Sequence, residues 1–174
     1  MVAIVLAVII GIVVWRITGD DRNSLRVDAC PIGPDTVFPD TDEVATLEEA
    51  RQRSYFGVGV PEYLPAGVSL RFVGVQVDPS CPDERIRSVH LGFDGPGYTF
   101  TIEESGGGPG KVSQSEPFRF NGMEGLVFRR ADPDGRHLVA FHWADSKRGY
   151  AAYAFLDGGL TEASFLEILE SIPE

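Results

Sequence analysis

The chain has 174 residues, which is enough for one domain and a short additional segment. Hydrophobic residues make up 43% of the chain and aromatic residues 10%, so it can build a core and is not disordered throughout. Fifteen basic and 26 acidic residues give a net charge of -11, which disfavours binding to nucleic acid or to anionic lipid headgroups.

The N-terminus begins with an uninterrupted apolar run, MVAIVLAVIIGIVVW, and residues 17–19 extend it past Arg16. A helix over residues 1–19 would be about 28 Å long, close to the hydrocarbon thickness of a bilayer. A cleaved signal peptide is the alternative, but basic residues before the run and an Ala-x-Ala-like site after it are both missing. We therefore predict an uncleaved transmembrane anchor over residues 1–19.

Residues 20–45 contain six aspartates and three prolines, a composition typical of an extended linker. Cys30 in this linker and Cys81 are the only cysteines, and they do not supply the four closely spaced ligands of a structural zinc site. Cys30 and Cys81 either form a disulfide, which persists outside the cytoplasm, or are two buried thiols. We predict a Cys30–Cys81 disulfide and an extracytoplasmic domain over residues 46–174.

The arginines that follow the anchor favour the opposite orientation. Arg16, Arg22 and Arg26 all lie on its C-terminal side, and the positive-inside rule would place that side in the cytoplasm. The prediction of a cell-membrane protein with its domain outside therefore rests on the cysteines and on the family resemblance given below.

Regular structure is predicted from Thr46 onward. The sequence TLEE is a capping box, in which Thr46 and Glu49 satisfy each other's backbone amides, and it predicts a short helix that ends by Ser54. The stretch VPEYLPAGVSL over residues 60–70 then contains two prolines and a glycine. We interpret it as a lead-in to the sheet, with Tyr63 and Leu64 as an apolar plug.

Strands are predicted over residues 68–77, 86–93 and 97–103, where apolar residues alternate with polar ones. Turn sequences at residues 94–97, 121–122, 132–135 and 145–149 imply short connections, and therefore antiparallel pairing. In residues 137–144 and 150–156 both faces are apolar or small, which indicates strands covered on both sides. A C-terminal helix capped by Thr161 would cover one side with apolar residues at helical spacing, namely Phe165, Ile168, Leu169 and Ile172.

Two segments carry a resemblance to a known family. Residues 46–70, TLEEARQRSYFGVGVPEYLPAGVSL, and residues 160–172, LTEASFLEILESI, resemble a bacterial domain of unknown function. That domain lies at the extracytoplasmic end of membrane-anchored anti-sigma-factor-like proteins, and it is distantly similar to periplasmic sigma-factor regulators and lipoprotein carriers. The resemblance implies a curved, half-barrel-like antiparallel sheet that holds helices. It carries over neither anti-sigma activity, because the chain starts at the membrane, nor any catalytic residue.

Sequence motifs of catalysis are weak. The stretch SGGGPGKV over residues 105–112 has Ser105 and Val112 where a phosphate-binding loop needs glycine and Ser or Thr. His142 lies in an ordinary strand alternation, and Glu103 and Glu104 would point to opposite faces of a strand. We therefore predict no catalytic residues, no metal site and no cofactor.

The sequence thus predicts an α+β domain tethered to the membrane, with a short N-terminal helix and a packed C-terminal helix. Its predicted function is that of a non-catalytic sensor or binding module for an apolar ligand or a partner's apolar segment. The candidate binding face bears Val139, Phe141 and Trp143, opposite Leu138 and Ala140. An interaction subunit of a membrane complex is the alternative, and an enzyme is the second alternative.

Overall fold

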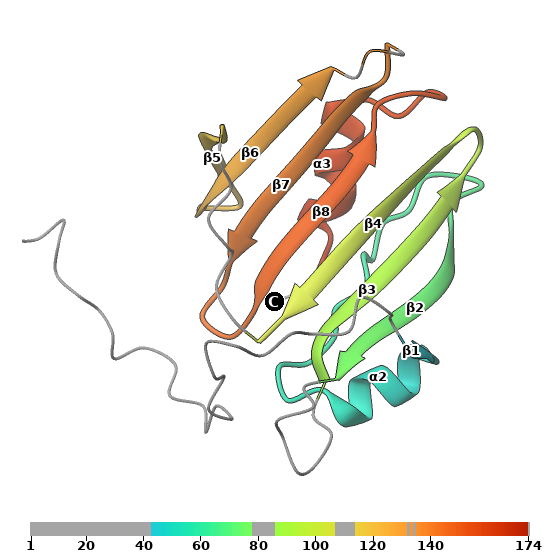
Figure 1. The fold of residues 1–174 in the computed structure, drawn as a ribbon, viewed down its shortest axis with the longest axis vertical. Coiled ribbons are helices and arrows are strands. Elements are labelled where there is room, and N and C mark those ends of the chain that lie inside the picture. The colour runs from blue at the N-terminus through green and yellow to red at the C-terminus, as the bar shows by residue number, and fades with distance from the viewer. Residues whose placement is uncertain (1–42, 78–85, 107–113, 132, 134, 174) are drawn as a thin grey trace, which may run out of the picture. The chain divides into compact units, whose positions relative to one another are not determined.

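One eight-stranded antiparallel sheet forms the framework of the protein (Figure 1). The structure is a computed structural model, and it describes residues 43–77, 86–106, 114–131, 133 and 135–173. The described helices are α2 Leu47–Arg53 and α3 Glu162–Glu170. The strands are β1 Glu43–Ala45, β2 Ser69–Val77, β3 Ile86–Gly95, β4 Tyr98–Ser105, β5 Glu116–Phe120, β6 Met123–Ala131, β7 His137–Ala144 and β8 Gly149–Phe155.

The strand order across the sheet is β1-β2-β3-β4-β8-β7-β6-β5. It consists of two four-stranded meanders, β1–β4 and β5–β8, joined where β4 pairs with β8 from Phe100↔Ala154 to Ser105↔Gly149. All strand pairs are antiparallel, as the short predicted connections required. Between β5 and β6, Asn121 and Gly122 have φ of 46° and 79°, the positive values that an Asn-Gly hairpin turn adopts.

The predicted helix caps are present. The Thr46 hydroxyl oxygen accepts a hydrogen bond from the Glu49 amide at 3.2 Å, and the Glu49 carboxylate accepts one from the Thr46 amide at 2.7 Å. Thr161 caps α3 in the same way with Ser164. One boundary differs from the prediction, because the last three residues of the proposed linker form β1, which pairs with β2. Regular structure therefore begins before Thr46.

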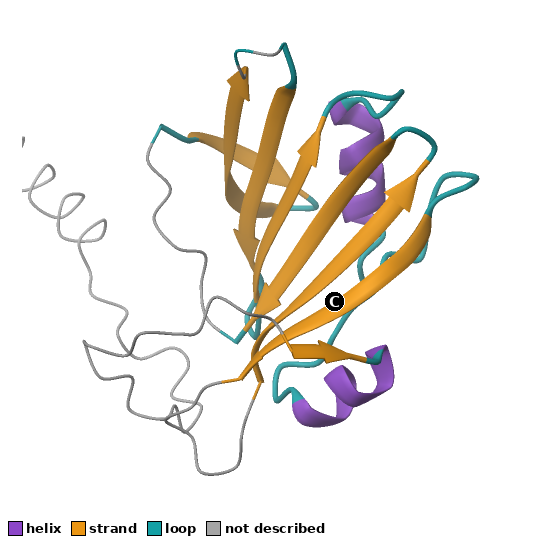
Figure 2. Ribbon diagram, turned by 45° about the vertical axis from the view of Figure 1, so that its right-hand side comes forward, coloured by secondary structure: helices purple, strands orange, loops and turns teal. Residues whose placement is uncertain are grey.

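The core lies on the side of the sheet that faces α3, which we call the inner face (Figure 2). The helix buries Phe165, Ile168 and Leu169 completely or nearly so, and they pack against the strands. The Phe165 ring lies 5.4 Å from the Phe100 ring of β4 and 5.9 Å from the Phe141 ring of β7. The C-terminal helix therefore packs against the sheet, as predicted.

Residues 54–68, here called the lead-in segment, connect α2 to β2 and cover part of the inner face beside α3. Phe56, Val58 and Pro61 are buried in this segment, and Leu64 packs partly against the core. Tyr63 is 48% exposed. The predicted lead-in is therefore present, but the prediction that Tyr63 acts as an apolar plug is wrong, because Val58 and Pro61 are the buried residues.

The β5–β6 end of the sheet curls toward α3. The Asn121 side-chain amide donates a hydrogen bond to the Glu170 carbonyl at the end of the helix, 3.2 Å away. The Phe120 ring of β5 lies 5.2 Å from the Trp143 ring of β7. The sheet is accordingly curved around its helix, in agreement with the expected α+β architecture (Figure 2).

Several predictions fall on residues outside the described part of the chain. These are the anchor over residues 1–19, residues 20–42 of the linker, and both members of the Cys30–Cys81 disulfide. Within the described residues, no helix is long and apolar enough to cross a membrane. The anchor and the disulfide therefore stay predictions.

Candidate functional site

The predicted binding face is part of the core. Val139 and Phe141 are fully buried and Trp143 is 2% exposed. Phe141 packs against Phe165 of α3, and the Trp143 ring stacks on Tyr150 at 4.7 Å. These side chains offer no open surface to a ligand. The sequence interpretation was wrong here because α3, the lead-in segment and the curled β5–β6 hairpin together fill the inner face.

The opposite side of the sheet, which we call the outer face, bears His142, Leu126 and Glu103. These residues lie in one row across the register, which runs from Glu103 through Ala151 and His142 to Leu126. Among the described residues, neither helix lies over β5–β7 on this side in either view (Figures 1 and 2). The outer face is thus the surface where a binding site has room.

A groove of about 500 Å³ opens where β5, β6 and β7 meet. This volume lies within the range of ligand-binding clefts. An exposed ion pair, Arg119 to Glu124 at 2.9 Å, stands at its rim. The groove is mainly apolar and is lined by Pro117, Phe118, Arg119, Glu124, Gly125, Leu126 and His142.

His142 supplies the groove with a polar group that is largely neutral. Its side chain is 8% exposed, and its ring meets the Tyr153 ring edge to face at 5.7 Å. Burial lowers the pKa of His142, and the nearby Glu103 carboxylate opposes this only in part. A neutral imidazole has one donor and one acceptor nitrogen, so it can pair with a backbone amide or carbonyl of a bound chain.

Ser88, His90 and Glu103 lie close together on the same face, in a set of residue types that resembles a hydrolytic triad. However, Ser88 Oγ at 3.3 Å and Glu103 Oε1 at 3.7 Å both face the same nitrogen, His90 Nε2. Ser88 also donates its hydroxyl proton to Gln76 at 3.3 Å, and it is only 2% exposed. A relay needs the two partners on different ring nitrogens, so this arrangement does not activate Ser88 as a nucleophile.

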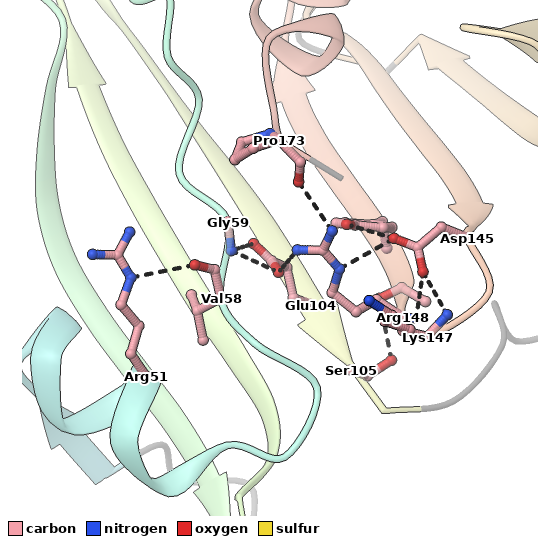
Figure 3. Close-up of polar contacts among 11 residues, drawn as sticks. Arg51, Val58, Gly59, Glu104, Ser105, Asp145, Lys147, Arg148 and Pro173 are labelled. Carbon is pink, nitrogen blue, oxygen red and sulfur yellow. Dashed lines mark hydrogen bonds and ion pairs between the residues drawn. The ribbon is translucent and has the colours of Figure 1, made fainter.

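A second polar cluster is buried on the inner face (Figure 3). Glu104 of β4 has no exposed surface, and both of its carboxylate oxygens accept the Gly59 amide at 3.1 Å. Its second partner is Arg148 Nη1, 3.6 Å away in the turn between β7 and β8. Arg148 is 7% exposed and donates through Nη2 to the Pro173 carbonyl at 3.0 Å.

Asp145 completes this cluster and holds Arg148 in place. Its Oδ2 accepts hydrogen bonds from Arg148 Nε and from the Tyr150 hydroxyl, both at 3.1 Å. Its Oδ1 accepts the backbone amides of Lys147 and Arg148 at 2.6 and 2.7 Å. A buried arginine thus lies between two carboxylates, which compensates part of its desolvation cost.

The two carboxylates of the cluster have opposite pKa shifts. Burial raises the pKa of Glu104 to about 7, against the lowering effect of the Gly59 amide and the Arg148 charge. Burial would also raise the pKa of Asp145, but the Lys147 and Arg148 amides and the Arg148 charge hold it below its usual value. Glu104 is therefore the group in this cluster that titrates near neutral pH.

The chain matches no protein-family model, no curated protein and no solved structure. Within the described residues, no group of three or more His, Cys, Asp or Glu side chains is arranged to hold a metal ion.

One residue of the buried cluster, Glu104, was predictable from the sequence although no site was predicted there. The alternation in YTFTIEE places Tyr98, Phe100 and Ile102 on one face of β4, and the same period of two places Glu104 beside them. Glu103 and Glu104 do point to opposite faces, as predicted, with Glu104 buried and Glu103 partly exposed. No such periodicity indicates Arg148, which forms the ion pair with Glu104, because Arg148 lies in a turn.

Proposed function

We propose that the protein is a membrane-tethered, extracytoplasmic, non-catalytic binding module that holds an extended apolar segment of a partner polypeptide. The observation that carries this proposal is the groove of about 500 Å³ on the outer face. Leu126 and Pro117 provide its apolar lining, and the largely neutral His142 provides a hydrogen-bonding group.

An extended peptide is the occupant that fits best because the groove adjoins β5, which is one of the two edge strands of the described sheet. An added strand pairs its backbone with such an edge and directs alternate side chains toward one face. Pro117 within β5 limits this pairing to part of the strand, since proline has no amide to donate. Side-chain contacts in the groove therefore supply much of the binding.

The three histidines allow a direct test with the full-length protein in detergent. NMR resonances of the imidazole groups are assigned from single His→Asn variants, and a short peptide of alternating leucine and serine is added. We expect the His142 resonance to shift. We expect no shift at His137, which is exposed at the far end of β7. Leu126→Asp should abolish the His142 shift, because a carboxylate in the apolar groove opposes binding.

A peptide of the same length in which proline replaces each serine serves as the control, since it cannot pair as a strand. Equal shifts at all three histidines, or an unchanged His142 resonance with every apolar peptide, would exclude the proposed site.

The two cysteines provide a separate test of the proposed extracytoplasmic location. We expect mass spectrometry of non-reduced peptides to show Cys30 linked to Cys81 in protein taken from intact cells. Such a bridge closes a loop of about 50 residues and stabilises the folded state by about 4 kcal/mol on the chain-entropy estimate. Two thiols that react with an alkylating agent in intact cells would contradict both the bridge and the extracytoplasmic location.

A further inference from the structure

The buried Glu104 cluster joins parts of the chain that are far apart in the sequence (Figure 3). Glu104 lies in β4 and accepts the Gly59 amide of the lead-in segment. Arg148 belongs to the β7–β8 turn, and it bridges Glu104 to the carbonyl of Pro173 near the C-terminus. We call Gly59, Glu104, Arg148 and Pro173 the clasp. It holds both the lead-in segment and the C-terminal end against the inner face.

We propose that the clasp is a proton-operated latch, in which loss of the Glu104 proton favours release of the lead-in segment from the inner face. The carboxylate of Glu104 is fully buried while the segment is in place. An ionised carboxylate is much better solvated by water than by a protein interior. Any opening that lets water reach Glu104 is therefore favoured more when the group is charged.

The direction of the effect follows from proton linkage. In the closed form the pKa of Glu104 is about 7, whereas a hydrated glutamate has a value near 4.5. Between these values the closed form binds more protons than the open form, so the free energy of opening falls as the pH rises. The latch is therefore firmest in acid and loosens as the pH rises through about 7.

The other charged groups around Glu104 do not titrate in this range. Arg148 in the β7–β8 turn and Arg51 on α2 both favour the ionised carboxylate, and arginine stays charged. The pKa of Asp145 is lowered, so it stays ionised, and burial raises the pKa of Tyr150, so it stays neutral. The change in charge within the clasp is thus confined to Glu104.

The lead-in segment and the C-terminal end should move together. The Glu62 amide donates to the Ser171 carbonyl at 3.0 Å, and the Tyr63 amide donates to the Ser171 hydroxyl oxygen at 3.0 Å. When the contacts of Glu104 break, the Gly59 amide loses its acceptor in β4. Arg148 still donates to the Pro173 carbonyl, but its ion pair with β4 is lost. The outer groove lies on the other face of the sheet, so the latch does not depend on the proposed binding function.

Native-state hydrogen exchange of the Gly59 amide in the full-length protein tests the latch. Its protection factor, relative to the base-catalysed rate of an unstructured amide, should fall roughly tenfold or more between about pH 5.5 and 8.5. The Glu62 and Tyr63 amides should follow Gly59. Glu104→Gln should abolish the change, whereas Glu103→Gln, which alters the neighbouring carboxylate on the outer face, should keep it.

The Phe165 amide of α3 separates local opening from global unfolding, because it donates to Thr161 within the helix. We expect Gly59 to exchange faster than Phe165 and to respond less to low concentrations of urea. Equal protection at Gly59 and Phe165 would show that only global unfolding hydrates Glu104, which would overturn the latch. A Gly59 protection factor independent of pH in the wild-type chain would overturn it as well, whether or not the Glu104→Gln variant folds.

Discussion

Replacing Phe165 with aspartate is expected to unfold most of the domain at room temperature. Phe165 is fully buried and packs against Phe100 and Phe141 from two strands, one in each meander. Removing a buried phenylalanine costs about 3–5 kcal/mol, and an unpaired carboxylate in the core adds several more. The sum is comparable to the whole stability of a typical domain, about 5–15 kcal/mol.

Urea denaturation followed by far-UV circular dichroism measures this effect. Ala163→Asp is the matched control, because it places the same carboxylate on the exposed side of the same helix, in its first turn. We expect the control to change the free energy of unfolding by less than about 0.5 kcal/mol. A Phe165→Asp variant as stable as the control would contradict the packing of α3 in the core.

Replacing Arg148 with methionine is expected to be the second most damaging change, and its cost should depend on pH. The substitution removes the ion pair and leaves the ionised Glu104 buried without a counter-charge. Breaking one side of a buried pair costs about 3–5 kcal/mol. Near pH 5 the cost should be smaller, because a carboxyl group with a pKa of about 7 is already protonated there.

The double variant Arg148→Met with Glu104→Gln tests whether the unpaired charge of Glu104 causes this loss of stability. We expect it to be more stable than Arg148→Met alone at about pH 8, since no charge is then left unpaired at position 104. Lys147→Met changes the exposed neighbour in the same turn and should have little effect. If Arg148→Met lost the same stability at both pH values, its role would be packing and not charge compensation.

The pH dependence of the wild-type protein contains opposing contributions, and those of Glu104 and His142 both fall near neutral pH. The raised pKa of Glu104 stabilises the fold in acid, and this contribution is lost as the pH rises from about 4.5 to about 7. The lowered pKa of His142 acts in the opposite sense, because its contribution is lost as the pH falls below its usual value of 6.5. Both variant series therefore leave His142 unchanged.

Local features of this fold were predictable from the sequence, and long-range ones were not. The caps at Thr46 and Thr161 and the turn at Asn121 depend on residues within a few positions of one another, and all three are present. The pairing of β4 with β8 joins residues some fifty positions apart, and the period of two in each strand does not determine its neighbour.

The candidate sites show the same division. Apolar residues on both faces of β7 indicated two covered sides, but the residues of the lead-in segment that help to fill the inner face have no regular period. The choice of Val139, Phe141 and Trp143 as a binding face failed for that reason. The groove depends on the register that places Leu126 opposite His142, and this register is visible only in the folded sheet.

The strand order also constrains how the domain folds during its synthesis. β8 is the last strand in the chain, yet it lies in the middle of the sheet between β4 and β7. While the chain emerges from the ribosome, the first meander ends at β4, whose edge stays unpaired until residues 149–155 have been synthesised. An unpaired strand edge is open to wrong partners during this interval. Termination before residue 149 would therefore leave two half-sheets with no strand to join them.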